Sequence, residues 1–186
     1  MNKENPLAKQ SKEWLCQAFF NLLEKHDYDE ISVKDISLEA GLARRTFYRA
    51  FKNKDDLLEY YGRKIIDKYI KELGTLKAAK MSFNQVLNLF FNFWWHQREQ
   101  VRLLIKKNLF INLLAKITPQ SPKLYEYFHA PWHLKATPQQ RAYIMSFSVG
   151  GFWNILNSWL AKDEPEEPEE MAGLLIQALR RISDFS

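Results

Sequence analysis

Helical periodicity runs through the whole chain, and no segment shows the strict alternation of apolar and polar residues that is typical of a half-buried strand. In the first predicted helix, apolar residues recur every three or four positions and share one face. They are Leu15, Ala18, Phe19, Leu22 and Leu23. Because 46% of the 186 residues are apolar and only 6 are Gly and 7 Pro, the chain can build a packed core. We therefore expect an all-α fold.

The predicted helices form two groups. The first helix ends near His26, and caps, glycines and prolines place the others at about 32–40, 42–51, 53–73, 83–96, 97–115, 139–161 and 168–183. No Gly/Ser-rich or Pro-rich linker separates the first helices from the rest. We expect an N-terminal domain of residues 1–54 and a larger helical domain of residues 55–186, joined by a rigid helix.

Positive charge is concentrated in residues 40–54. This segment has five basic residues and no acidic one, whereas residues 1–55 as a whole carry 10 bases and 9 acids. On the predicted helix at 42–51, Phe47, Ala50 and Phe51 share one face and the basic residues share the other. Short helices joined by tight turns, the last of them basic, are typical of a helix-turn-helix that enters the major groove of double-stranded DNA.

The positions of the charged and polar residues suggest which part of DNA each would contact. Arg44 and Arg45, early in the helix, are candidates for base edges, because a guanidinium can bind guanine with two hydrogen bonds. Candidates for contacts to the phosphate backbone are Ser32, Tyr48, Arg49, Lys52 and Lys54. The alternative is a basic helix face that is simply solvated.

The segment Ser32–Leu58 closely resembles the DNA-binding segment of the tetracycline-repressor (TetR/AcrR) family, and the resemblance extends over about residues 10–60. The residues at the family's spacing are Ile36, Ala40-Gly41, Thr46-Phe47-Tyr48, Phe51, Lys54 and Leu57-Leu58. The resemblance implies that Tyr48 and Lys54 contact operator phosphates and that Ser32 caps a helix beside the DNA. It adds Thr46 to the candidate DNA-binding residues.

The chain departs from the family pattern at two positions. Ala43 stands where a serine is common, so we expect a weaker cap at the start of the basic helix. Arg45 stands where a small residue is common, so we expect an altered base preference.

The resemblance also implies a homodimer with a helical C-terminal domain that dimerises and binds an effector. The uncharged segment 145–160 and the last helix could form a four-helix seam across a two-fold axis. Candidate interface residues are Phe147, Gly150, Gly151, Trp153, Leu156, Leu175, Leu179 and Ile182. The alternative is that these residues form the core of one chain.

A small-molecule pocket is suggested by the density of aromatic residues beside a few polar groups in the central helices. Candidate ligand-binding residues are Phe91, Trp94, Trp95, His96, Phe110, Tyr125 and Trp132. Aromatic residues of this kind most often pack in a hydrophobic core, so the alternative is that these residues form the core and line no pocket.

Other classes of function are disfavoured. We expect no metal or other cofactor, because Pro131 separates His129 from His133 and interrupts a regular helix there. The uncharged segment 142–161 has the length of a membrane span, but 7 of its residues are Ser, Asn or Gly, which favours a helix buried in protein. The sequence contains no Gly-rich phosphate loop or nucleophile elbow, so we do not expect an enzyme.

The sequence therefore predicts a dimeric, operator-binding transcription regulator. The single cysteine and the absence of a signal-like N-terminus favour the cytoplasm. We expect a repressor whose DNA binding is modulated by a small molecule in the C-terminal domain. The alternative is a C-terminal domain that binds a protein partner.

Overall fold

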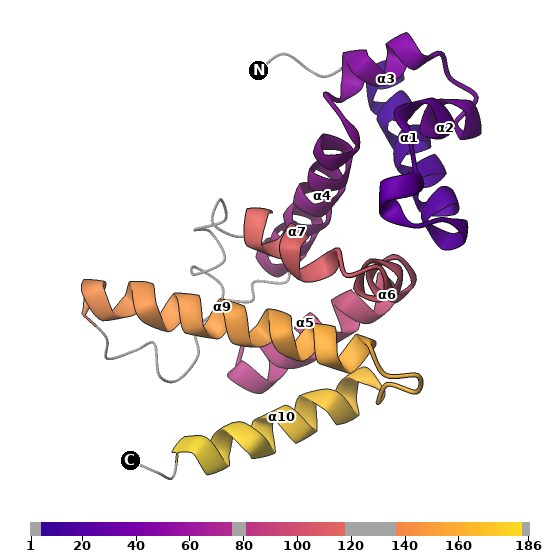
Figure 1. The fold of residues 1–186 in the computed structure, drawn as a ribbon. Coiled ribbons are helices and arrows are strands. Elements are labelled where there is room, and N and C mark those ends of the chain that lie inside the picture. Colours follow the sequence, from indigo (N-terminus) through magenta and orange to yellow (C-terminus); the bar gives the residue numbers. More distant parts are fainter. Residues whose placement is uncertain (1–4, 76–80, 118–136, 184–186) are drawn as a thin grey trace. The chain divides into compact units, whose positions relative to one another are not determined.

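The computed structural model describes residues 5–75, 81–117 and 137–183, and in these residues all regular structure is helical (Figure 1). The all-α prediction is confirmed. The chain divides into two compact units, Met1–Ile65 and Ile66–Ser186, and the division falls within one long helix, α4 (Lys54–Thr75).

The first unit contains three α-helices, one turn of 3-10 helix and the start of α4. The elements are α1 (Pro6–Lys25), η1 (Tyr28–Glu30), α2 (Val33–Glu39) and α3 (Arg44–Ala50). Helix α1 packs against both α2 and α3. The apolar face predicted for α1 supplies much of the core, in which the fully buried side chains include Leu15, Phe19, Leu23, Ile36, Phe47 and Leu57.

Local sequence signals set the ends of α2. The Ser32 hydroxyl accepts a hydrogen bond from the Asp35 amide (3.2 Å), and the Asp35 carboxylate accepts one from the Ser32 amide (3.0 Å). At the other end Gly41 has φ 64°, and the amides of Gly41 and Leu42 bond the carbonyls of Leu38 and Ser37. A left-handed glycine thus ends α2 and begins the turn to α3.

The second unit is built from longer helices and the remainder of α4. They are α5 (Phe83–His96), α6 (Arg98–Lys106), α7 (Phe110–Ile117), α9 (Pro138–Leu160) and α10 (Pro168–Ser183). Helix α5 packs against α10, and α9 contacts α6 and α7. Aromatic rings fill the core around α5: Phe90 contacts Tyr69, Phe152 and Trp153, and Phe91 contacts Trp159.

The prediction of one helix over residues 97–115 is wrong, because the segment breaks at Asn108. Asn108 has φ 57°, its amide bonds the Ile105 carbonyl, and the Leu109 amide bonds the Leu104 carbonyl. This is the same type of ending as at Gly41, with asparagine in the left-handed position that it tolerates better than most residues. The turn lets Leu104 and Phe110 both be buried.

Among the described residues, no helix combines the length and the hydropathy that crossing a bilayer requires. This holds for α9, which contains most of the uncharged segment 142–161.

Candidate nucleic-acid interface

Helix α3 has a buried apolar face and an exposed basic face. Phe47 is fully buried, with its ring edge against Phe51, and anchors the helix to the first unit. Arg44, Arg45 and Arg49 are exposed, and Tyr48 is 50% exposed. The structure therefore presents the three arginines and the tyrosine to solvent from one short, firmly packed helix.

Arg44 and Tyr48 form a pair on this face. The Arg44 guanidinium donates a hydrogen bond to the Tyr48 hydroxyl (3.1 Å) and lies 5.5 Å from the centre of its ring. A guanidinium has five N–H donors in a rigid plane, so most of them stay available to a base or a phosphate. The contact fixes the direction of both side chains before any ligand is bound.

Arg45 and Arg49 are positioned differently. Within the described part of the chain, neither guanidinium has a hydrogen bond or an ion pair. The backbone amide of the exposed Lys52 donates a hydrogen bond to the Asp56 carboxylate (3.0 Å). The Lys52 ammonium has no hydrogen bond or ion pair with the described residues. These three cations can adapt to the shape of a bound polyanion.

Residues at the starts of α2 and α3 contribute backbone geometry. Ser32 is exposed, and its hydroxyl caps the start of α2 as described above. The hydrogen bonds from Ser32 hold the pKa of the Asp35 carboxyl below its ordinary value. Ala43 precedes α3 without a side-chain cap, as expected for alanine. The amide of the half-buried Thr46 bonds the Ala43 carbonyl (2.7 Å) and closes the first turn.

Lys54 differs from the exposed cations because it is half-buried. Its ammonium donates hydrogen bonds to the carbonyls of Tyr28 (2.5 Å) and Ile31 (3.1 Å) and lies 4.2 Å from the centre of the Tyr28 ring. Lys54 thus fastens both ends of η1 to the start of α4. An ammonium has three donors, so one remains for a phosphate. The phosphate contact of Lys54 stays a prediction.

Tyr28 and Asp55 complete this contact and were not among the predicted site residues. The Tyr28 hydroxyl donates to the Asp55 carboxylate (2.5 Å), and burial, followed by that carboxylate, raises the pKa of Tyr28. The two residues are far apart in the sequence, so no local sequence pattern predicts that they are hydrogen-bonded. We refer to Tyr28, Lys54 and Asp55 as the α4 clasp.

Comparisons with known proteins agree with this geometry. The family model of bacterial regulatory proteins of the tetR family matches residues 16–61, which contain α2, α3 and the clasp. A second model, a C-terminal region of transcriptional regulators, matches residues 82–181. The chain belongs to the TetR family of transcriptional regulators. It is a DNA-binding regulator, and the family is not one of enzymes.

Relatives of known sequence resemble parts of this TetR-family chain. An uncharacterised HTH-type transcriptional regulator of Haemophilus influenzae is 27% identical over 101 residues, which are 52% of this chain and 54% of the relative. The dhaKLM operon activator DhaS of Lactococcus lactis is 39% identical over 46 residues, 25% of each protein. The chain therefore matches about half of the first relative's length and a quarter of the second's.

Solved structures share the fold over nearly the whole chain. A TetR regulator of Streptococcus agalactiae superposes with a TM-score of 0.63 at 19% identity, covering 92% of this chain and 94% of that one. The fatty acid degradation regulator FadR of Bacillus halodurans superposes with a TM-score of 0.59 at 19% identity, covering 96% of each chain. At these identities the likeness concerns the fold alone.

The structure places the predicted ligand-binding residues in several environments. Phe91, Trp94 and Phe110 are buried in the core. The Trp95 ring stacks on Trp159 at 5.4 Å, and the exposed His96 ring nitrogen Nδ1 is 2.7 Å from the Asn92 carbonyl. Tyr125 and Trp132 lie outside the described residues. Their role in ligand binding stays a prediction.

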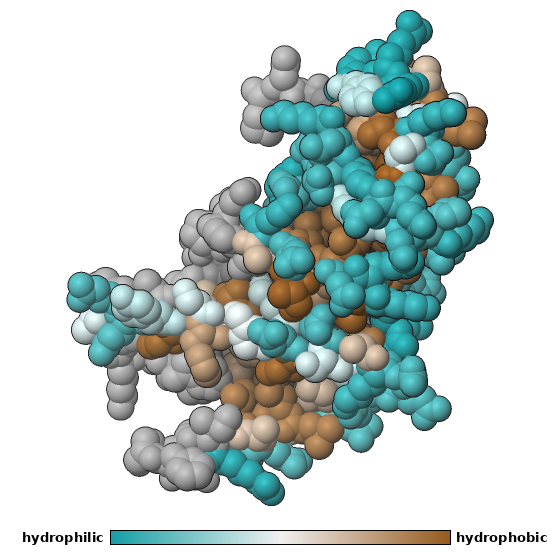
Figure 2. Space-filling view, in the orientation of Figure 1, coloured by the Kyte–Doolittle hydropathy of each residue, from teal (hydrophilic) through white to brown (hydrophobic). Residues whose placement is uncertain are grey.

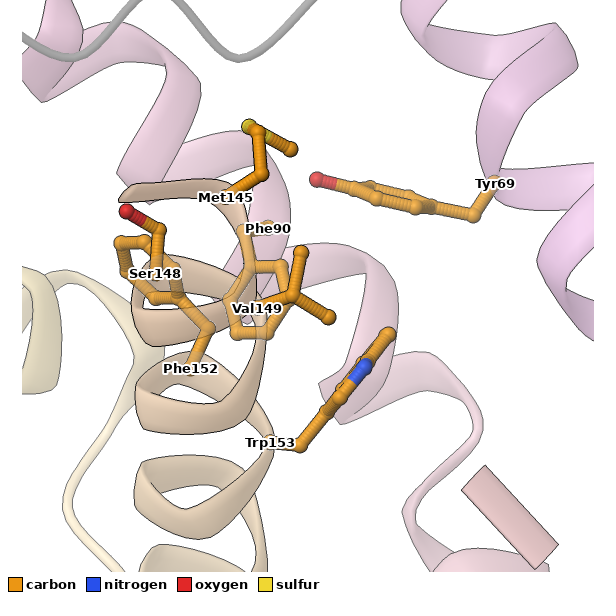
Figure 3. Close-up of a pocket in the computed structure, with 7 residues that line it drawn as sticks. All are labelled: Tyr69, Phe90, Met145, Ser148, Val149, Phe152 and Trp153. Carbon is orange, nitrogen blue, oxygen red and sulfur yellow. The ribbon is translucent and has the colours of Figure 1, made fainter. Parts of the chain in front are cut away.

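A cavity lies nearby, among other residues of α4, α5 and α9 (Figure 3). Its volume is about 20 Å³. The empty space around it, including the part that is open to solvent, is about 350 Å³. Its walls are formed by Tyr69, Phe90, Met145, Ser148, Val149, Phe152 and Trp153. Sequence patterns did not indicate this site, because Tyr69 and the residues of α9 are far apart along the chain.

The predicted dimer residues divide between an exposed and a buried set. Phe147 is 77% exposed, and a Cβ added at Gly150 or Gly151 would meet no neighbouring atom. Trp153, Leu156 and Leu175 are buried within their own chain, and Leu179 is half-buried. The side chain of Ile182 lies outside the described part of the structure.

The histidines do not form a metal site among the residues described. No group of three potential ligands was found there, and His129 and His133 lie outside that part of the chain.

Proposed function

We propose that this TetR-family chain binds its operator as a homodimer, with α3 of each copy in the major groove, and acts as a repressor. The observation that carries the proposal is the exposed face of α3, where three arginines stand in a segment without any acidic residue. A focused positive potential attracts the DNA backbone, and arginines on a helix of this size can reach base edges. The DNA-binding domain is then residues 1–54.

Each side chain has a proposed part in this contact. Arg44, held by Tyr48, and the unrestrained Arg45 read base edges near the start of α3. The phosphate contacts are assigned to Ser32, Thr46, Tyr48, Arg49, Lys52 and the third donor of Lys54. These contacts fix the orientation of α3 and carry no sequence information themselves.

The proposed dimer interface lies in residues 55–186, on the outer face of α9 and α10. The support is an exposed apolar surface: Phe147 is exposed, Tyr143 is 80% exposed and Leu174 is 46% exposed. Figure 2 shows apolar residues gathered between α9 and α10. The open space above Gly150 and Gly151 allows a second helix to approach closely. Trp153 and Leu156 support this face from inside.

A small molecule bound in the second unit is proposed to modulate DNA binding. The cavity beside Tyr69 supports this part of the proposal. A ligand that binds one conformation of the dimer more tightly shifts the population toward it, and thereby changes operator affinity. The alternative is a protein partner on the exposed apolar surface of α9, which would then compete with self-association.

The sign of regulation needs its own measurement. DhaS, which is 39% identical to this chain over 46 residues, is named an activator. Transcription in vitro from a bound promoter distinguishes the two: repression lowers the transcript when protein is added, and activation raises it.

Selection from random duplex DNA tests the proposal as a whole. The native chain is expected to enrich one two-fold symmetric site, and the double variant Arg45→Ala/Arg49→Ala is expected to lose that enrichment. The control Lys25→Ala/Lys71→Ala removes the same charge from exposed positions outside α3 and should enrich the parent site. Equal enrichment by both double variants would contradict the role of α3.

A further inference from the structure

The Tyr69 hydroxyl is one of several buried polar groups in the second unit that lack a hydrogen-bond partner among the described residues, and Tyr69 also lines the cavity. Tyr69 is only 1% exposed, and its hydroxyl has no hydrogen-bond partner among the described residues. In Figure 3 its ring extends from α4 toward α9, and the hydroxyl end lies closest to Met145 in that view. The hydroxyl is therefore buried, on a residue that lines the cavity, and is unpartnered in the part of the chain that the structure describes.

A buried hydroxyl without a partner destabilises a folded protein, because it loses its hydrogen bonds to water and gains none in return. Phenylalanine would fill the same space without that loss. Burial also raises the pKa of Tyr69, so the hydroxyl stays protonated and can donate a hydrogen bond. A hydrogen-bond partner that is not among the described residues would explain why position 69 is tyrosine and not phenylalanine.

Water is a poor candidate for that partner. A cavity of about 20 Å³ has room for a single water molecule. A buried water molecule normally makes about three hydrogen bonds, and the described residues around the cavity offer only the hydroxyls of Tyr69 and Ser148 and the indole N–H of Trp153, which can donate but not accept. The other described residues of the wall, such as Phe90, Val149 and Phe152, are aromatic or aliphatic.

The wall also limits the charge of a ligand. Among the residues that the structure places around the cavity, none is charged. An ionised ligand would lose its hydration there without gaining a counter-charge, whereas a neutral apolar one would gain contacts with the rings. The aromatic wall favours a flat or ring-shaped body.

We propose that the cavity beside Tyr69 binds a small, neutral, mainly apolar ring compound whose single oxygen hydrogen-bonds to the Tyr69 hydroxyl. A ring needs more space than the present 20 Å³, since a cavity that holds benzene measures about 150 Å³. Binding a ring therefore requires side chains of the wall to move, and Met145, whose unbranched side chain lines the cavity, can change rotamer easily. That such a ligand regulates DNA binding rests on the proposed function.

Calorimetry on the whole 186-residue chain tests the proposal with phenol, toluene and benzoate as probes. Phenol and toluene have nearly the same shape and differ in the oxygen, and benzoate adds a charge. The native protein is expected to bind phenol about tenfold more tightly than toluene, as one hydrogen bond predicts, and benzoate not measurably. Tyr69→Phe is expected to lose this preference and to bind phenol no more tightly than toluene, because the phenol hydroxyl would be buried without a partner. Tyr61→Phe, which removes a hydroxyl from the same helix without changing a residue that lines the cavity, is the matched control and should keep the native preference for phenol.

Thermal unfolding of the same variants provides a second measurement. Tyr69→Phe without ligand is expected to unfold at or above the native temperature, because it removes an unpartnered hydroxyl. A midpoint several degrees lower would show that the hydroxyl is bonded within the protein and would overturn the proposal. It would also be overturned if the native protein bound neither phenol nor toluene, if Tyr69→Phe kept the preference for phenol, or if benzoate bound as tightly as phenol.

Operator binding without ligand separates this proposal from the proposed function. Native protein and Tyr69→Phe should bind operator equally in the absence of phenol. If the protein binds operator but does not prefer phenol, only the proposed ligand class is refuted. If the protein binds phenol as expected but does not bind operator, only the proposed function is refuted.

Discussion

Replacing Lys54 by methionine removes the ammonium of the α4 clasp while keeping a side chain of similar length. In the native chain the ammonium donates to the carbonyls of Tyr28 at 2.5 Å and Ile31 at 3.1 Å, and it lies over the Tyr28 ring. The variant leaves both carbonyls without this donor. The start of α4 is then held to η1 mainly by the hydrogen bond between Tyr28 and Asp55.

The size of the loss follows from these contacts. A hydrogen bond to a charged group contributes about 1.5–3 kcal/mol, and a cation over an aromatic ring about 0.5–1 kcal/mol at an exposed site. Lys54 is only half-buried, so water replaces part of what is lost. We expect the free energy of unfolding of the first unit to fall by about 2–3 kcal/mol.

Urea unfolding followed by circular dichroism measures this change. Lys52→Met is the matched control, because Lys52 is exposed and only its backbone amide is bonded, so we expect a change within about 0.5 kcal/mol. If Lys54→Met were as stable as Lys52→Met, the ammonium would not be holding the two carbonyls. The proposed phosphate contact is tested separately by operator affinity across salt concentrations, where its loss lowers the slope by about one.

Three further predictions concern α3, α2 and α9. Arg45→Ala is expected to change the preference at one base position by roughly 1–3 kcal/mol, and an unchanged selected site would reject that role. The hydrogen bonds from Ser32 lower the pKa of Asp35, so the ionised carboxylate stabilises the fold fully above the ordinary pKa of 3.8, and this stabilisation is lost as pH falls through the lowered pKa. Asp35→Asn should therefore lose less stability than the native chain when unfolding is measured at falling pH. An unchanged dependence of stability on pH would contradict this. Phe147→Asp is expected to convert a dimer to a monomer in sedimentation at micromolar concentration, and a variant that still dimerises would exclude Phe147 from the interface.

Much of the first unit could be predicted from sequence because its signals are local. Ser32 with Asp35 sets the start of α2, and Gly41 sets its end, each within a few residues. The buried and exposed faces of α3 follow from the spacing of Phe47 and the arginines. Helical periodicity and capping are short-range properties, so a single sequence carries them.

The features that sequence reasoning missed depend on contacts between distant residues or on a rare conformation. The α4 clasp joins Tyr28 to Lys54 and Asp55 across 26 and 27 residues. The break at Asn108 required a left-handed asparagine where periodicity alone continued the helix. Aromatic residues of α5 satisfy the pattern of a pocket and of a core equally well, and only packing distinguishes the two readings.

Methylation protection of operator DNA by dimethyl sulfate tests the central claim most directly, because the reagent methylates N7 of guanine in the major groove. We predict that the bound protein protects guanines in two half-sites whose centres are about 10 base pairs, or a simple multiple, apart, and that Arg45→Ala loses protection at one guanine in each half-site. Full methylation of every guanine N7 in DNA that is demonstrably bound would contradict the placement of α3 in the major groove.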